Sequence, residues 1–170
     1  AADIDGARAA AVAAKTGGEA AEVDIFDRGA LVCLLEGATL LFNAVGPYHR
    51  TAAPAIEAAL AAGVHYADMA DDHEAAEMVF LDPTWDARAR AAGISVLVGC
   101  GIAPGLTGLL ARLGCERLDV AERVAVRFSW NYSITYPAAI HHFLRINSGM
   151  APQFVDGAHM RPGAFADPEE

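Results

Sequence analysis

Residues 94–105 have the sequence ISVLVGCGIAPG, and this stretch decides the fold class. The range 94–98 is a short apolar run, which is typical of a strand buried on both faces of a parallel sheet. Gly99, Gly101 and Gly105 follow it and permit a tight turn. A helix to about Leu113 is predicted next, so the stretch forms a strand–turn–helix unit whose turn lies at the carboxyl end of the strand.

The same alternation of apolar runs and helical segments precedes this unit. Asp5, Asp27, Thr51 and Asp82 are predicted to cap helices, because their side-chain oxygens can accept from free backbone N–H groups. Helices are expected over 7–15, 29–35, 51–62 and 83–92, and strands over 23–26, 39–43 and 65–68. Strands that alternate with helices imply βαβ units and a parallel sheet covered on both faces. The fold class is therefore α/β, with a doubly wound parallel sheet.

The pattern changes near residue 120. Residues 124–130 alternate with period two, which is typical of an antiparallel strand with one wet face. A helix is predicted over 136–147, and an extended segment over 153–158 with a turn at Asp156 and Gly157. These features predict one domain over residues 1–120 and the beginning of a second, α+β domain over 121–170.

Composition excludes several classes of protein. The chain has 170 residues, a hydrophobic fraction of 54% and a net charge of −10. Its Lys and Arg residues are scattered, which argues against binding nucleic acid. No run approaches the roughly 18 uncharged apolar residues that span a membrane. The three cysteines form no C-x-x-C pair, which argues against disulfides and a zinc site and favours a reducing, cytoplasmic location.

Asp3 is the first candidate for binding a ligand. An acidic residue at the end of the second strand of a nucleotide-binding sheet accepts hydrogen bonds from the adenosine ribose hydroxyls. A carboxylate there also repels a 2′-phosphate, which favours NAD over NADP. The alternative is that Asp3 only caps the next helix, which is the interpretation we favour for Asp5.

Two turns that follow strands are the next candidates. Asn43, Ala44, Val45 and Gly46 follow an apolar strand, and their small side chains permit close approach of a cofactor to the backbone. The glycine-rich turn at 99–101 could pack against a flat ligand such as a nicotinamide ring. The alternative for both is an ordinary turn between a strand and a helix.

Other reactive side chains lie near the same edge. Cys100 has no flanking His or cationic residue to activate it, so it is interpreted as a small buried residue. Tyr66, Asp68 and His49 are candidate catalytic residues by location, although Asp68 could equally cap a turn. The cluster at 71–73 contains metal-ligand residue types but is interpreted as a solvated loop, and no metal site is predicted.

The order and spacing of these motifs resemble the saccharopine dehydrogenase family. The residues that carry the resemblance are 24–27, 41–48, 58–63, 65–68, 91–93 and 98–106, and it spans about residues 1–130. The resemblance implies a Rossmann domain, a nicotinamide cofactor (NAD or NADP) and hydride transfer on an amino-acid-derived or related small substrate. It also implies that Asp3 binds the ribose, that Asp27 lies near the adenine, and that 43–46 and Gly99, Cys100 and Gly101 face the cofactor.

The family's G-x-G-x-x-G loop is absent from these 170 residues, and with it the helix N-terminus that binds the pyrophosphate. Both ends of the chain are interpreted as truncations, so the sheet is expected to lack its first strand. We therefore predict that the chain alone binds NAD(H) weakly or not at all and is inactive by itself. The alternatives are a non-catalytic nucleotide-binding module or a reductase for another class of substrate. A homodimer of the full-length protein is the expected assembly.

Overall fold

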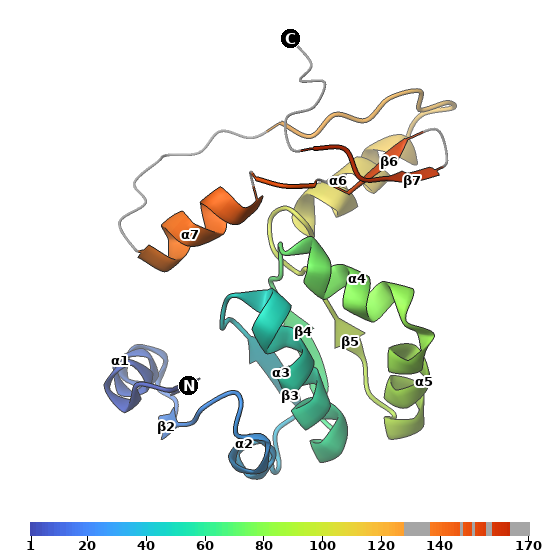
Figure 1. Ribbon diagram of the computed structural model, residues 1–170. Helices are drawn as coiled ribbons and strands as arrows, with labels where there is room; N and C mark the ends of the chain where they lie inside the picture. Colours follow the sequence, from blue (N-terminus) through green and yellow to red (C-terminus); the bar gives the residue numbers. More distant parts are fainter. Residues whose placement is uncertain (128–136, 147, 151, 156–157, 164–170) are drawn as a thin grey trace. The chain divides into compact units, whose positions relative to one another are not determined.

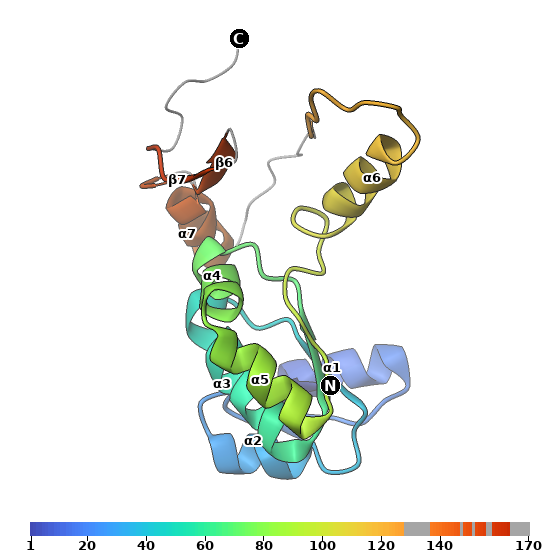
Figure 2. The same ribbon diagram turned by 90° about the vertical axis from the view of Figure 1, so that its right-hand side faces the viewer.

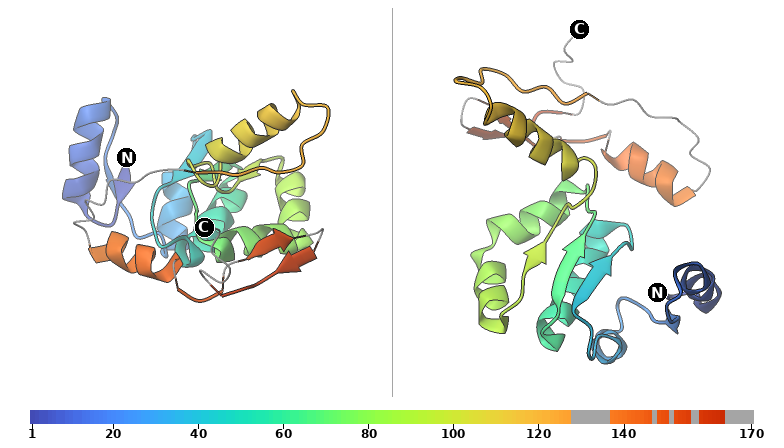
Figure 3. Two further views of the ribbon diagram at one scale, coloured as in Figure 1. Left: turned by 90° about the horizontal axis from the view of Figure 1, so that it is seen from above. Right: turned by 180° about the vertical axis from the view of Figure 1, so that it is seen from behind.

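The computed structural model describes residues 1–127, 137–146, 148–150, 152–155 and 158–163. The chain divides into two compact units, Ala1–Glu122 and Arg123–Glu170. The main sheet lies in the first unit and contains β3 (Leu40–Asn43), β4 (His65–Asp68) and β5 (Val96–Leu97). All its strands are parallel, in the order β3-β4-β5 (Figure 3). The predicted α/β class with a parallel sheet is confirmed.

A second, smaller sheet pairs β1 (Ala2–Asp3) with β2 (Ala21–Glu22), also in parallel. The helix between them, α1 (Gly6–Thr16), begins at Asp5, whose carboxylate accepts from the N–H groups of Ala7 and Arg8. The strand predicted at 23–26 is wrong. Its place is taken by a turn, in which the Asp24 carboxylate accepts from the Phe26 N–H at 2.9 Å. The strand lies two residues earlier because that register pairs with β1.

Helices α2 (Arg28–Leu34), α3 (Tyr48–Ala62), α4 (His73–Leu81) and α5 (Pro83–Ala92) surround one face of the main sheet (Figure 1). Helix α3 is central to the core: Ala55, Ile56 and Ala59 pack against Tyr66 of β4, with side chains of β3, β5 and α5 at the rim. Ala58, on another side of α3, packs against α2. Figure 2 shows α3 and α5 lying side by side.

The start of α3 differs from its prediction. The helix begins at Tyr48, three residues before the expected cap Thr51, because Pro47 already has an extended backbone and occupies the capping position. Helix α4 was not predicted at all. Asp72 lies at its N-cap position with only 2% of its surface exposed, so the interpretation of 71–73 as a solvated loop is wrong for that residue.

The opposite face of the main sheet is more open than predicted. Leu40, Phe42 and Leu97 expose 52%, 50% and 56% of their surfaces, whereas Leu41 packs into the core. The predicted burial on both faces is therefore wrong for β3 and β5. Strand β5 is also shorter than the predicted 94–98, because the N–H of Ile94 bonds to the carbonyl of Ala89 and completes the end of α5.

The first unit continues into α6 (Leu106–Cys115), on which no residue is buried. In the second unit, α7 (Pro137–Ile146) lies within the predicted helix, and β6 (Gln153–Val155) pairs antiparallel with β7 (Ala158–Met160). Residues 124–127 form no strand, and the rest of that predicted strand lies outside the described residues, as do Asp156 and Gly157. Within the described ranges, every helix is too short or too polar to cross a membrane.

Candidate functional site

The carboxyl ends of β3 and β4 bring two polar side chains together. Asn43 and Asp68 are direct register partners at the ends of these strands, and both are buried. The amide Nδ2 of Asn43 donates to the Tyr66 hydroxyl at 3.2 Å. That hydroxyl donates to Asp68 Oδ2 at 2.7 Å. The sequence placed these residues at one edge, and the structure joins them in one hydrogen-bonded chain.

Asp68 connects this chain to the turn after β5. Its Oδ1 accepts from the Gly99 N–H at 2.8 Å and from the Ala70 N–H at 3.0 Å. The Cys100 N–H donates to the Asp68 carbonyl at 2.7 Å. A buried carboxylate is tolerated where several donors satisfy it, and here they come from two segments. Asp68 therefore fixes the position of the glycine-rich turn.

Tyr66 and Asp68 are enclosed rather than open to a ligand. Neither has any exposed surface. Burial raises the pKa of the Tyr66 hydroxyl far above its ordinary value, and the hydrogen bond from Asn43 opposes that rise. Their burial and hydrogen bonds indicate that Tyr66 and Asp68 hold the strand ends in position. The catalytic role predicted for them stays a prediction.

The glycines of the turn at 99–105 pack against their own loop. A Cβ on Gly99 would lie 2.9 Å from Pro104 Cγ, and a Cβ on Gly105 would lie 2.3 Å from the Gly101 carbonyl oxygen. Gly105 also has a φ of +118°, which side chains with a Cβ rarely adopt. Internal packing thus accounts for these glycines, and contact between the turn and a cofactor stays a prediction. Cys100 is exposed, so its interpretation as a buried residue is wrong.

The turn after β3 is held from both sides. The Val45 N–H donates to Asn43 Oδ1 at 2.9 Å. The hydroxyl of Thr51, on the first turn of α3, donates to the carbonyls of Val45 and Pro47. Thr51 was predicted only as a helix cap, and its contact with Val45 could not be inferred from spacing alone.

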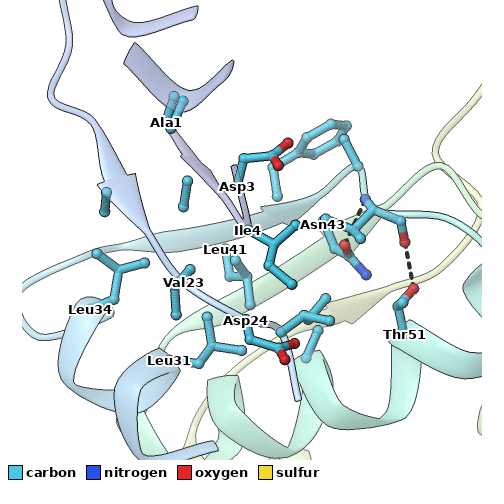
Figure 4. A pocket seen from close by; sticks show the side chains of 18 of the residues that line it. Ala1, Asp3, Ile4, Val23, Asp24, Leu31, Leu34, Leu41, Asn43 and Thr51 are labelled. Carbon is cyan, nitrogen blue, oxygen red and sulfur yellow. Dashed lines mark hydrogen bonds between the residues drawn. The ribbon is translucent and has the colours of Figure 1, made fainter. Parts of the chain in front are cut away.

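A pocket of about 1090 Å³ lies between the small sheet and β3 (Figure 4). Asp3, Asn43, Ala44, Val45 and Gly46 all line it. The structure therefore brings the predicted ribose ligand and the predicted turn after β3 to one cavity. Asp3 also accepts from the Asp5 N–H at 2.9 Å, so it makes the local turn and lines the pocket at once.

Other predicted cofactor residues lie elsewhere. Asp27 is outside the pocket lining, and its Oδ1 caps α2 by accepting from the Ala30 N–H at 3.0 Å. The turn at 99–101 is also outside the lining. Two cations that the sequence reasoning did not select, Arg8 and Arg50, do line the pocket, and Arg50 lies over the Phe26 ring at 5.8 Å.

His49 faces a carboxylate and lies outside the pocket lining. Its Nδ1 lies 3.3 Å from Asp72 Oδ2, which also accepts from the His49 backbone N–H at 3.1 Å. On the same turn of α3, burial raises the pKa of the Tyr48 hydroxyl, and three nearby carboxylates raise it further. The catalytic role predicted for His49 from its location stays a prediction.

A parallel sheet whose strands end in turns of small residues, with a pocket that extends to these turns, is typical of Rossmann-type nucleotide-binding domains. Residues 1–98 match the family described as the saccharopine dehydrogenase NADP binding domain, and the chain belongs to this family. The resemblance inferred from the sequence is thereby confirmed. A nicotinamide cofactor agrees with the family's description, but the predicted preference for NAD is not supported, since that description names NADP. No curated protein matches the chain.

Proposed function

We propose that this chain binds a nicotinamide dinucleotide with the adenosine end beside Asp3, and that it serves hydride transfer on an amino-acid-derived small molecule. One observation carries the proposal. Asp3 and the turn at 43–46 come from separate strands, yet they line one pocket that extends to the carboxyl ends of parallel strands. Ligands of open α/β sheets bind at that edge, where strand order changes. We also propose a cytoplasmic location, because the three cysteines form no C-x-x-C pair and their odd number argues against a disulfide framework.

The pocket residues suit the parts of such a ligand. A carboxylate at position 3 can accept from ribose hydroxyls, and small residues at 44 and 46 permit the ligand to approach the backbone. Arg8 and Arg50 supply positive charge for phosphate groups in the same lining. Because the 170 residues contain no G-x-G-x-x-G loop, we expect the affinity to be weak.

Saturation-transfer NMR is suited to such weak binding. With the 170-residue chain and NADPH or NADH, we expect transfer to the adenosine ribose protons, and a loss of that transfer in Asp3→Ala. Asp27→Ala is the matched control, because this carboxylate caps a helix outside the pocket. No transfer to either dinucleotide would contradict the proposal, and tight binding by calorimetry would contradict the expected weakness.

A second function, nucleotide binding without catalysis, is favoured by a specific observation. Two candidate catalytic residues, Tyr66 and Asp68, are fully buried and hydrogen-bonded to each other. Oxidation of NADPH in the presence of amino-acid and keto-acid pairs separates the two functions. Turnover above the uncatalysed rate supports an oxidoreductase, whereas binding without turnover supports a nucleotide-binding module.

A further inference from the structure

A histidine and a buried aspartate connect the first turns of two helices in the first unit. The Nδ1 of His49, on the first turn of α3, lies 3.3 Å from Asp72 Oδ2, which also accepts from the His49 backbone N–H at 3.1 Å. Asp72 occupies the N-cap position of α4, but among the described residues its side chain accepts no capping bond from that helix. Its carboxylate therefore holds both the backbone and the ring of a residue on the neighbouring helix.

The bond to Asp72 determines which ring nitrogen of His49 carries the proton. An ionised carboxylate only accepts hydrogen bonds, so Nδ1 is the protonated nitrogen. In the neutral ring Nε2 is then unprotonated and can accept a proton. Within the described part of the chain no bond to Nε2 is present, and 21% of the His49 side chain is exposed. The pair thus has the arrangement in which an aspartate orients a histidine that acts as a base.

The pair lies beside the turn that the sequence predicts to face the nicotinamide. This turn, at 99–101, packs against the segment that leads from β4 to α4, since a Cβ on Gly99 would lie 3.4 Å from the Ala70 carbonyl oxygen. Tyr48 of α3 packs against Ala70 as well. The first turns of α3 and α4 and the predicted nicotinamide turn are therefore neighbours at the carboxyl ends of β4 and β5.

The same pair lies across the end of β3 from the pocket that contains Asp3. The pocket borders β3, whereas β4 pairs with β3 and Asp72 follows β4. His49 itself does not line the pocket. A dinucleotide with its adenosine end beside Asp3 would cross the turn at 43–46 to reach the pair, which places the pair at the reacting end of the ligand.

The surroundings of the pair carry negative charge. Burial raises the pKa of the Tyr48 hydroxyl, and the charges of Asp68, Asp71 and Asp72 raise it further. The next residue along α3, Arg50, lines the adenosine pocket instead. A negative potential favours a cationic ligand, and an ammonium group also carries a proton that a ring nitrogen can accept.

We propose that His49 accepts a proton from the ammonium group of an amino-acid-derived substrate, and that Asp72 positions the His49 ring. The N–H bond of the ammonium group breaks, its proton goes to Nε2 and its electron pair stays on nitrogen. That pair then forms the C=N bond as a hydride leaves the adjacent carbon, for which the oxidised nicotinamide supplies the acceptor. The substrate loses one proton and one hydride and becomes an iminium ion, while Asp72 stabilises the imidazolium. This inference rests on the proposed oxidoreductase function.

Nitrogen-15 NMR of the histidine rings locates the proton without any ligand. In the neutral rings, we expect His49 to prefer the Nδ1–H tautomer by about tenfold or more. His65 is a reference of the opposite kind in the same spectrum, because its Nδ1 accepts from the Ser95 N–H at 3.0 Å, so its proton lies on Nε2. A preference of His49 for the Nε2–H tautomer would overturn the proposal, whether or not the chain binds a dinucleotide.

The second part of the experiment adds NADP+ and pools of the common L-amino acids to the 170-residue chain. We expect the amino acids to shift the Nε2 signal of His49 toward that of a protonated nitrogen. The corresponding 2-keto acids are the control, because they lack the ammonium group and should leave the signal unchanged. An equal response to both classes, or no response to either, would overturn the proposal. The ribose signals in the saturation-transfer experiment report dinucleotide binding separately, so that failure of the proposed function is recognised by itself.

Three variants separate positioning of the ring from capping of α3. Asp72→Ala removes the acceptor, so the tautomer preference of His49 should be lost, whereas Asp71→Asn, at the neighbouring exposed position, should retain it. Asp72→Asn keeps an oxygen for the His49 backbone N–H but removes the charge, so the affinity for amino acids should fall about tenfold. An unchanged His65 signal shows that each variant keeps its sheet. An unchanged response to amino acids in folded Asp72→Asn would overturn the positioning role, because it would show that Asp72 only caps α3.

Discussion

The carboxylate of Asp68 accepts hydrogen bonds from the Tyr66 hydroxyl and from the backbone of Ala70 and Gly99, with no surface exposed to water. These bonds connect the end of β4 to the turn after β5. Removing a buried acceptor leaves its donors unsatisfied, which costs more than the bond itself contributes. The position of the turn therefore depends on one side chain.

We predict that Asp68→Ala lowers the free energy of unfolding by about 3 kcal/mol, and that Asp68→Asn lowers it by less, because the amide oxygen can still accept from the backbone. Urea denaturation of the chain measures both changes. Asp82→Ala is a matched control, because that exposed carboxylate only caps α5. Equal, small losses in all the variants would contradict the role given to Asp68.

Asp3 allows a second prediction at this scale. Its carboxylate can accept from a ribose hydroxyl and repels a 2′-phosphate, so Asp3→Ser should lower the affinity ratio of NADH to NADPH by about tenfold, roughly 1.4 kcal/mol. Competition between the two dinucleotides in saturation-transfer NMR gives the ratio. Asp5→Ser is the control, since Asp5 lies outside the pocket lining. An unchanged ratio in Asp3→Ser would show that another residue discriminates.

The sequence could predict the positions of some residues but not the hydrogen bonds or the exposure of others. Asp3 and Asn43 could be selected from strand ends and residue type, and both line the pocket. The hydrogen bonds of Asp68 could not be predicted, because they depend on the approach of the turn after β5. The exposure of Cys100 was missed for the same reason: burial depends on contacts that are distant in sequence.

At the scale of helices and strands, helix caps were predicted more reliably than the residues that pair in a sheet. The caps at Asp5, Asp27 and Asp82 and the end of the helix predicted over 51–62 were correct, because a cap involves neighbours within a few residues. The prediction of a strand at 23–26 was wrong. Its apolar residues fit the pattern of a strand, but the residues that pair with β1 are Ala21–Glu22.

The contact between α3 and α5 gives a pH-dependent prediction. The two terminal guanidinium nitrogens of Arg88 donate to Glu57, at 2.7 and 2.5 Å, and this hydrogen bonding lowers the pKa of the Glu57 carboxyl. A lowered pKa stabilises the fold above the ordinary pKa of Glu, and this contribution is lost as the pH falls through the lowered value. Both side chains are partly exposed, so the contribution is at most about 1 kcal/mol.

Glu57→Gln should therefore reduce the free energy of unfolding at pH 7 by at most about 1 kcal/mol, and the difference should vanish as the pH falls through the lowered pKa and Glu57 becomes protonated. Thermal unfolding across this pH range checks the difference. Asp86→Asn, which removes an exposed ion pair within α5, is the control. A loss of equal size at both ends of this range would contradict the electrostatic explanation.

The turn before α6 supports a prediction about backbone strain. Gly105→Ala places a Cβ against Gly101 at a φ of +118°, so it should destabilise the turn by about 2 kcal/mol or more. Faster amide exchange at Cys100 and Leu106 would report the change. Gly108→Ala, within α6 and with open space around it, should instead stabilise the helix slightly. Similar effects of both substitutions would contradict this account.

For the first unit as a whole, the alternation of strands and helices was sufficient to predict a parallel α/β sheet. It did not predict the open face, because a continuous apolar strand is typical of a sheet covered on both faces, whereas Leu40, Phe42 and Leu97 are about half exposed. The division into two sheets with a cavity between β1 and β3 likewise depends on which strands pair.

We have proposed that a nicotinamide dinucleotide binds at the carboxyl ends of β1 and β3. Titration of the isotope-labelled chain with NADPH, followed by ¹⁵N–¹H correlation NMR, tests it most directly. We expect the largest chemical-shift changes at the amides of Asp3, Ile4, Ala44, Val45 and Gly46, which line the pocket. Shifts confined to residues outside that lining, such as those of α5, would contradict it.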